Sequence, residues 1–493
     1  MHPHTLLCAT MLSKDEHAYR ERMEDFVSGL TGTTMAELVL VSMPIPMGIW
    51  LLGETKALLA GRKKALPMMS WHFFVLEMLA VLFPAVACMV WPQLTATLVL
   101  SMAITSFCSR LKQRPSLKPS SGDPGERAAG REWMIDSVTN VRASIMLMTC
   151  ITILAVDFQA SNTNGLRVFP RRFAKTEVFG TGLMDLGVGA TIFASGLASG
   201  CRTKRQSNSA KLGWSAWRAA LADMTSAAIR AWPLAALGVS RLVVIKGLGY
   251  QEHVSEYGVH WNFFATLFFM RLVVVPVDRL CPVRLKSCVA LAALGVYQWF
   301  LVKRGLSDFI VYAPRDTLFA MNREGILGLV GFVSIYYIAE ELGSQIQTHR
   351  LKLGKGGTYP RFLWSSLAVA AKTNVILWAL TLFSKACIQQ TSRRMVNLTY
   401  VLWVCAHSML MLGLLMVVDS LSLKRPISQI LAAINSNMFP VFMVANLATG
   451  AINISMRTLD ADTPTAIVIL ATYVVFVAGF AVILANLGLT IKV

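Results

Sequence analysis

Apolar runs long enough to cross a lipid bilayer recur along almost the whole chain, and they constrain its fold more than any other feature. A membrane-spanning helix needs roughly twenty apolar residues, and by that criterion the sequence holds about thirteen candidates. Because a backbone in lipid must satisfy its own hydrogen bonds, such runs predict helices. The sequence therefore predicts an all-α polytopic membrane protein. The expected spans are residues 35–52, 69–90, 93–109, 143–158, 182–199, 218–243, 259–278, 285–302, 325–340, 362–383, 396–418, 430–452 and 464–487.

Composition agrees with this reading and excludes one class of partner. Of the 493 residues, 55% are hydrophobic and only 15% are charged, whereas a soluble protein carries about a quarter. The formal net charge of +19 comes from Lys and Arg that lie mostly between the apolar runs. Topology and anionic lipid headgroups explain that placement. With no zinc-finger spacing, P-loop or basic zipper, we expect no nucleic-acid partner.

The domain organisation is simple. Residues 1–34 form a polar tail, and residues 35–493 form a single transmembrane domain. Residues 110–141 are rich in Pro, Gly, Ser and charge, so we expect a flexible loop there. The cysteines are scattered without a CxxC pair, which predicts neither a disulfide framework nor a metal site. Lys and Arg favour the odd-numbered connectors and the C-terminal tail, which predicts a lumenal N-terminus, a lumenal connector at 159–181 and a cytosolic C-terminus.

Many polar residues lie inside the expected spans, where they cost free energy unless they face protein or a cavity. An interhelical hydrogen bond explains any one of them. Together they indicate a polar intramembrane cavity, and hence a transporter or an intramembrane enzyme. The set includes Glu37, Glu77, Asp157, Asp185, Asp223, Arg230, Arg241, Asn262, Arg271, Lys372, Asn374, His407, Asn435, Asn437, Asn446 and Asn453.

One stretch, AVDFQASNTNGLRVFPRRFAKTE, concentrates the chemistry. Asp157 ends an apolar run, and a dozen residues later cations and aromatics alternate. Pro170 suits the first turn of a helix, so the stretch after it predicts a short helix at the bilayer surface. Such a helix either binds an anionic headgroup and places a base beside a hydroxyl, or simply anchors the chain. The residues concerned are Phe169, Arg171, Arg172, Phe173 and Lys175.

The same region carries a family resemblance. VRASIMLMTCITILAVDF followed by VFPRRFAKTEVFGTGLMDLGVGATIFASGLAS resembles a block of the PIG-W family. These are glucosaminyl-phosphatidylinositol inositol acyltransferases of GPI-anchor synthesis. EDFVSGLTGTTMAEL, LGYQEHVSEYGVHWNFFATL and INSNMFPVFMVANLATGAINISMRT resemble further blocks in the same order. The resemblance covers most of the chain.

The resemblance implies an endoplasmic reticulum enzyme that transfers a fatty acyl group, typically palmitoyl, from acyl-CoA to the inositol ring of glucosaminyl-phosphatidylinositol. Acyl-CoA is then a co-substrate, and we expect no bound cofactor. The expected partners are acyl-CoA, glucosaminyl-phosphatidylinositol and membrane lipids. By the family motif, Asp157 is the expected general base and Lys175 its partner. Lys175 either orients the acid or stabilises the thioester oxyanion, and a close ammonium would lower the pKa of the acid.

The chain departs from the family in the connector after Asp157. With QASNTNGLRV, this connector is longer here by about eight residues. If Asp157 and Lys175 act together, this polar, turn-prone segment must loop out.

Other residues are candidates for the site on their own chemistry. His407 is a rival base, although a lone histidine in a span is more often a packing residue. Arg171 and Arg172 are expected to bind a phosphate of one of the substrates. The alternative is a structural ion pair with Glu177 or Asp185. The substrate-binding candidates are Phe169, Phe173, Asp185, His260, Asn262, Asn446 and Asn453.

Two further functions stay open at this stage. A lipid transporter or flippase accounts for the spans and buried charges, although no repeat is visible. A non-catalytic subunit of the GPI-synthesis machinery accounts for the resemblance without chemistry. The residues also leave the oligomeric state open.

Overall fold

The computed structural model of the chain describes residues 14–60, 71–112, 124–159, 168–202, 214–248, 254–282, 285–353, 359–422 and 428–491. Every regular element in these ranges is a helix, apart from one isolated parallel bridge between Gly32 and Thr181. The predicted all-α polytopic fold is confirmed. The helices are α2 (Lys14–Val27), α3 (Met35–Ser42), α4 (Pro44–Ala60), α5 (Trp71–Glu77), α6 (Phe83–Val90), α7 (Thr95–Lys112), α8 (Pro124–Ala155), α9 (Leu183–Arg202), α10 (Trp214–Arg230), α11 (Trp232–Leu248), α12 (Val254–Tyr257), α13 (Phe263–Leu280), α14 (Lys286–Lys303), α15 (Leu306–Tyr312), α16 (Leu318–Met321), α17 (Arg323–Leu353), α18 (Tyr359–Cys387), α19 (Leu398–Leu421), α20 (Gln429–Ser436), α21 (Met438–Ser455) and α22 (Thr463–Asn486).

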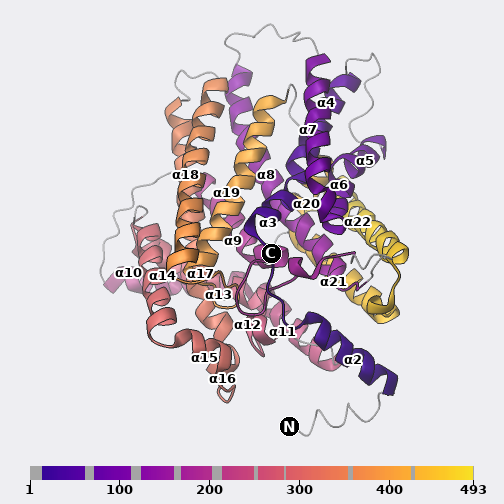
Figure 1. Ribbon diagram of the computed structural model, residues 1–493. Helices are drawn as coiled ribbons and strands as arrows, with labels where there is room; N and C mark the ends of the chain where they lie inside the picture. The colour runs from indigo at the N-terminus through magenta and orange to yellow at the C-terminus, as the bar shows by residue number, and fades with distance from the viewer. Residues whose placement is uncertain are drawn as a thin grey trace.

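Ten stretches of helix within these ranges are long and apolar enough to cross a membrane, and they coincide with ten of the expected spans. In Figure 1 the long helices α4, α7, α8, α17, α18 and α19 run upright beside one another, whereas α2 lies obliquely at the lower right, outside this bundle. The ten are Met35–Leu59, Trp71–Val90, Pro92–Lys112, Ser137–Ala155, Leu183–Arg202, Arg323–Thr348, Trp364–Cys387, Leu398–Leu421, Met438–Ser455 and Thr463–Asn486.

Three expected spans do not meet the same criterion. Residues 218–243 are not one span but two helices, α10 and α11, because Pro233 stands in the first turn of α11 and cannot continue the preceding helix. The expected span 259–278 corresponds to α13, which begins only at Phe263 and whose apolar run is interrupted by charges such as Arg271. Residues 285–302 lie in α14, which has a lysine at each end.

Segment 110–141, expected to be a flexible loop, is helical in its second half, because α8 begins at Pro124. Residues 113–123 of that segment lie outside the described ranges.

Several polar residues of the spans cap or break helices. Glu77 is fully buried and accepts hydrogen bonds from the backbone nitrogens of Gln429 and Ile430 at 2.9 and 2.8 Å, at the N-terminus of α20. Asn437 separates α20 from α21, within what the sequence predicts as one span. Its side chain donates to the carbonyl of Leu489 at 3.0 Å and so ties this break to the end of α22. These two residues serve the fold rather than the cavity.

Helix α9 packs along α17 at unusually short range, because glycines face the contact. A Cβ added to Gly196 would lie 2.3 Å from the carbonyl oxygen of Tyr336, and one added to Gly200 would lie 2.0 Å from that of Glu340. Only glycine permits this approach. It fixes α9, which forms one wall of the cavity described below.

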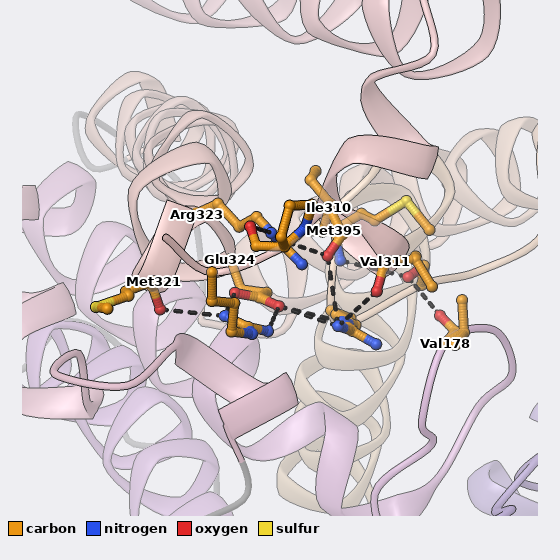
Figure 2. A network of polar contacts seen from close by, with 11 residues as sticks. Val178, Ile310, Val311, Met321, Arg323, Glu324 and Met395 are labelled. Carbon is orange, nitrogen blue, oxygen red and sulfur yellow. Dashed lines mark hydrogen bonds and ion pairs between the residues drawn. The ribbon is translucent and has the colours of Figure 1, made fainter. Parts of the chain in front are cut away.

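A buried polar network holds the loop between α18 and α19 (Figure 2). Glu324, at the start of α17, pairs with Arg394 at 3.1 Å and also with Arg315. Arg323 donates to the carbonyl oxygen of Ile310 at 2.9 Å. Because charges taken out of water need partners, this network makes the position of Arg394 well defined. The adjacent residue, Arg393, is thereby carried to the cavity.

Candidate active site

A cavity of about 200 Å³ lies among α3, α4, α8, α9, α19 and α21. Most of its wall is apolar, and charged side chains gather where the loops before α9 and α19 meet. We call that end the cavity mouth and define it by Lys175, Arg241, Glu256, Tyr257 and Arg393. Such a cavity suits a ligand with an apolar body and a charged head.

The loop of residues 168–182 carries Lys175 to the mouth. Its backbone forms a single 3-10 turn, Arg171–Phe173, and then extends, so the predicted surface helix is wrong. The reason is packing: Phe169 and Phe173 are both buried and meet edge to face at 5.8 Å between ring centroids. Both rings belong to the hydrophobic core and anchor the loop to it.

Asp185 holds the same loop from inside α9. Its carboxylate is fully buried and accepts hydrogen bonds from the hydroxyl of Thr176 at 2.9 Å and from the backbone nitrogen of Gly182 at 2.8 Å. Gly180 adopts a φ of +133°, and a Cβ there would lie 2.0 Å from the carbonyl oxygen of Thr31. The loop is therefore fixed between α9 and the N-terminal segment, and the sequence-predicted binding residue Asp185 is engaged in holding it.

The two arginines expected to grip phosphate have protein partners. Arg172 forms a bidentate pair with Glu37, with nitrogen–oxygen distances of 2.7 to 3.1 Å. Arg171 donates to the carbonyl of Phe26 and stacks over its ring at 3.7 Å. Among the contacts of the described residues, neither pairs with Glu177 or Asp185, the partners that the sequence suggested. Both arginines therefore connect the 168–182 loop to the N-terminal segment.

Lys175 meets a carboxylate that the sequence did not single out. Its Nζ lies 2.6 Å from Oε2 of Glu256, and Nη2 of Arg393 lies 2.6 Å from Oε1 of the same residue. Burial alone would raise the pKa of Glu256, but the two cations outweigh it and lower that pKa to about 2. Glu256 is therefore ionised at neutral pH and meets Lys175 and Arg393 as a carboxylate.

Asp157 lies two residues beyond α8 and bonds to α21. Its Oδ2 accepts a hydrogen bond of 2.7 Å from Nδ2 of Asn453. Burial raises the pKa of Asp157 to about 6, although Asn453, Lys175 and Arg171 each pull it down. Within the described ranges Asp157 and Lys175 influence each other electrostatically but share no ion pair. A carboxyl with this pKa is suited to exchange protons near neutral pH.

His407 lines the cavity, far from the mouth. It follows the start of α19 by nine residues, which is about 14 Å along the helix. Ser42 donates its hydroxyl proton to the carbonyl of Leu38 at 2.8 Å, so at 3.2 Å it accepts from Nε2 of His407. The other ring nitrogen, Nδ1, has no hydrogen-bond partner in the described part of the chain. His407 therefore has a free proton acceptor, but at mid-depth in the wall.

Of the three remaining predicted binding residues, one lines the cavity and two hold other parts of the fold. Asn446 lines the cavity and donates to Phe442 on its own helix at 2.7 Å. Asn262 is buried and caps α13, and its amide donates to the carbonyl of Gly238 on α11 at 2.8 Å. His260 is exposed, and its backbone nitrogen donates to Asn322 at 2.8 Å. Only Asn446 of these three side chains borders the cavity.

Sequence reasoning missed Glu256 and Arg393. Glu256 is part of LGYQEHVSEYGVHWNFFATL, a block that supported the family resemblance, so a signal for it was present. Arg393 stands in the short connector TSRRM, which no motif marked. The extra residues after Asp157 fall mainly on 160–167, outside the described ranges.

Comparison with known proteins identifies the family. A family model described as GWT1 matches residues 19–484. The chain is 33% identical over 505 residues to "GPI-anchored wall transfer protein 1" of Eremothecium gossypii, covering 97% of this chain and 100% of that protein. It is 30% identical over 509 residues to "Phosphatidylinositol-glycan biosynthesis class W protein" of Dictyostelium discoideum, covering 96% and 99%. With its all-α polytopic fold and a match along nearly its whole length, the chain belongs to the GWT1 (PIG-W) family.

Proposed function

We propose that this protein is an acyl-CoA-dependent O-acyltransferase of GPI-anchor synthesis. It transfers palmitoyl from palmitoyl-CoA to the inositol ring of glucosaminyl-phosphatidylinositol, on the lumenal side of the endoplasmic reticulum membrane. The names of its relatives supply the pathway. One observation carries the chemistry: an apolar intramembrane cavity opens onto Lys175, with the half-buried carboxyl of Asp157, whose pKa is raised, nearby.

The dimensions of the cavity support an acyl chain. Val141 and Ile153 both line it and lie twelve residues apart on α8, so the cavity follows this helix for about 18 Å. An extended sixteen-carbon chain is about 19 Å long, at roughly 1.3 Å per carbon for zigzag bonds of about 1.5 Å. A palmitoyl chain lying along α8 leaves its thioester at the mouth, beside Lys175.

In the proposed mechanism the two groups have separate tasks. Asp157 accepts the proton of the inositol hydroxyl as the hydroxyl oxygen attacks the thioester carbonyl carbon. Lys175, held by its ion pair with Glu256, stabilises the oxyanion that forms on that carbonyl. The carbon–sulfur bond then breaks, CoA leaves as a thiolate that takes up a proton, and the inositol ester remains. The apolar wall limits competing hydrolysis by excluding water.

The test is acyl transfer by purified protein in detergent, with labelled palmitoyl-CoA and glucosaminyl-phosphatidylinositol. Wild type should form labelled acylated lipid. Asp157→Asn should lose about a hundredfold or more in rate, as expected for a general base. Lys175→Met should lose on the order of a hundredfold as an oxyanion partner.

Lys303→Gln, which removes an exposed lysine at the end of α14, is the control for loss of a charge and should behave as wild type. Folded wild type that moves lipid without consuming acyl-CoA would instead indicate a transporter. If wild type and both variants support a GPI-synthesis complex equally well, and none of them transfers palmitoyl on its own, the protein is a non-catalytic subunit.

A further inference from the structure

Arg241 is a cation at the cavity mouth that the mechanism does not use. It projects from α11 with an exposed side chain and lines the same cavity as Lys175, Glu256 and Arg393. No carboxylate of the described residues lies within 4.0 Å of it. Among the described residues its positive charge therefore acts on Glu256 only at longer range, where it contributes to the lowered pKa of that carboxyl.

The orientation of Arg241 is built into the fold. Asn262, the capping residue of α13, donates its amide to the carbonyl of Gly238 on α11 at 2.8 Å. Gly238 and Arg241 are three residues apart and so lie on the same face of α11. The bond between the two helices therefore turns the face that carries Arg241 toward the mouth.

The charged side chains that line the cavity have a surplus of positive charge. The charged side chains lining the cavity are three cations and one carboxylate, a formal net charge of +2. Both oxygens of Glu256 are already engaged, with Lys175 and with Arg393 at 2.6 Å each. Arg393 is buried, yet its Nε has no hydrogen-bond partner among the described residues. Unsatisfied cationic donors beside an apolar cavity are matched by an anionic ligand group.

We propose that Arg241 and Arg393 bind a phosphate group of a substrate at the cavity mouth. The inference rests on the proposed function, because both substrates carry phosphate: CoA has a diphosphate, and glucosaminyl-phosphatidylinositol has a phosphodiester. Guanidinium groups form paired hydrogen bonds with phosphate oxygens. The phosphate site therefore lies here rather than at Arg171 and Arg172, whose guanidinium groups bind other parts of the protein.

The experiment measures initial rates of transfer for wild type, Arg241→Gln, Arg241→Lys and Arg230→Gln. Each substrate is varied while the other is held saturating. Arg230 is the matched control, because it is an exposed arginine at the end of neighbouring α10 and does not line the cavity. Arg241→Gln should raise KM for one substrate about tenfold or more, which is 1.4 kcal/mol per factor of ten, with kcat within about twofold. The KM of Arg241→Lys should lie between those of wild type and Arg241→Gln, and the KM of Arg230→Gln should match wild type.

The substrate whose KM rises identifies the source of the phosphate. A rise for palmitoyl-CoA assigns the CoA phosphates, and a rise for glucosaminyl-phosphatidylinositol assigns the lipid phosphodiester. Unchanged KM for both, in a folded Arg241→Gln variant, refutes the site while wild-type activity still supports the transferase. If wild type shows no turnover, the dissociation constants of the two substrates replace KM. Equal constants for wild type and Arg241→Gln then refute the site independently of the reaction.

Discussion

The hydrogen bond from Asn453 to Asp157 gives the sharpest test of the proposed base. It is short, at 2.7 Å, and it joins α21 to the residue just beyond α8. Burial raises the pKa of Asp157 to about 6, and Asn453 works against that rise because its amide stabilises the carboxylate. Asn453→Leu removes this donor while leaving in place the burial that raises the pKa of Asp157.

The expected magnitude follows from that contact. A hydrogen bond to a charged group contributes about 1.5–3 kcal/mol. At about 1.4 kcal/mol per pKa unit, its loss raises the pKa of Asp157 by roughly one to two units. A base acts in its ionised form, so activity falls as the pH drops through this pKa. The acidic limb of the pH–rate profile should therefore move from about pH 6 to roughly pH 7–8, and the rate at pH 7 should fall by roughly two- to tenfold.

The assay is kcat/KM for palmitoyl transfer between about pH 5 and 9, since that ratio reports the ionisation of the free enzyme. Asn374→Leu is the control, because its amide also links two helices, donating to the carbonyl of Ala406 at 2.8 Å, but it neither contacts Asp157 nor lines the cavity. The control should keep the acidic limb of wild type. An unmoved limb in folded Asn453→Leu would refute the assignment of Asp157 as the titrating base.

Three further variants test the surroundings of the site. Glu256→Gln leaves the buried Arg393 without its carboxylate and should cost about 3–5 kcal/mol of stability, seen as a lower midpoint of thermal unfolding; an unchanged midpoint would contradict the ion pair. Gly200→Ala places a Cβ 2.0 Å from a carbonyl oxygen of α17 and should destabilise by about 1–3 kcal/mol, whereas Gly187→Ala, whose Cβ meets its nearest atom at 3.5 Å, should be tolerated in the same assay. His407→Leu should keep transfer within a few-fold of wild type, and loss of all turnover would move the base from Asp157 to His407.

The sequence predicted the fold class because the bilayer imposes a simple rule. Every apolar run must be a helix, and the length of a run shows where one crosses. The rule fails where a side chain or a proline competes with the helix. Asn437 divides one expected span, and Pro233 begins a second helix inside another. Hydropathy averages over such single residues, so it predicts spans better than helix ends.

The candidate site was harder to predict, because its contacts join residues far apart in the chain. Lys175 and Glu256 are 81 residues apart, and Glu256 and Arg393 are 137 apart. Arg171 and Arg172 illustrate the opposite error. A cluster of cations beside a lipid surface suggests phosphate, but their partners, Phe26 and Glu37, come from an N-terminal segment whose position no local pattern indicates.

Glu256 also bears on a conflict that the sequence left open. If Lys175 oriented Asp157 through a close ion pair, its charge would lower the pKa of that acid and weaken it as a base. In the structure Nζ of Lys175 lies 2.6 Å from Oε2 of Glu256, and the pKa of Asp157 stays raised at about 6. A second carboxylate, that of Glu256, thus allows one site to hold an ion-paired lysine and a titratable acid together. Within the proposed mechanism, this separation assigns the oxyanion to Lys175 and the proton to Asp157. Glu256→Gln should then lower kcat more than it raises KM, while Glu256→Asp, which retains the charge, should recover part of the loss.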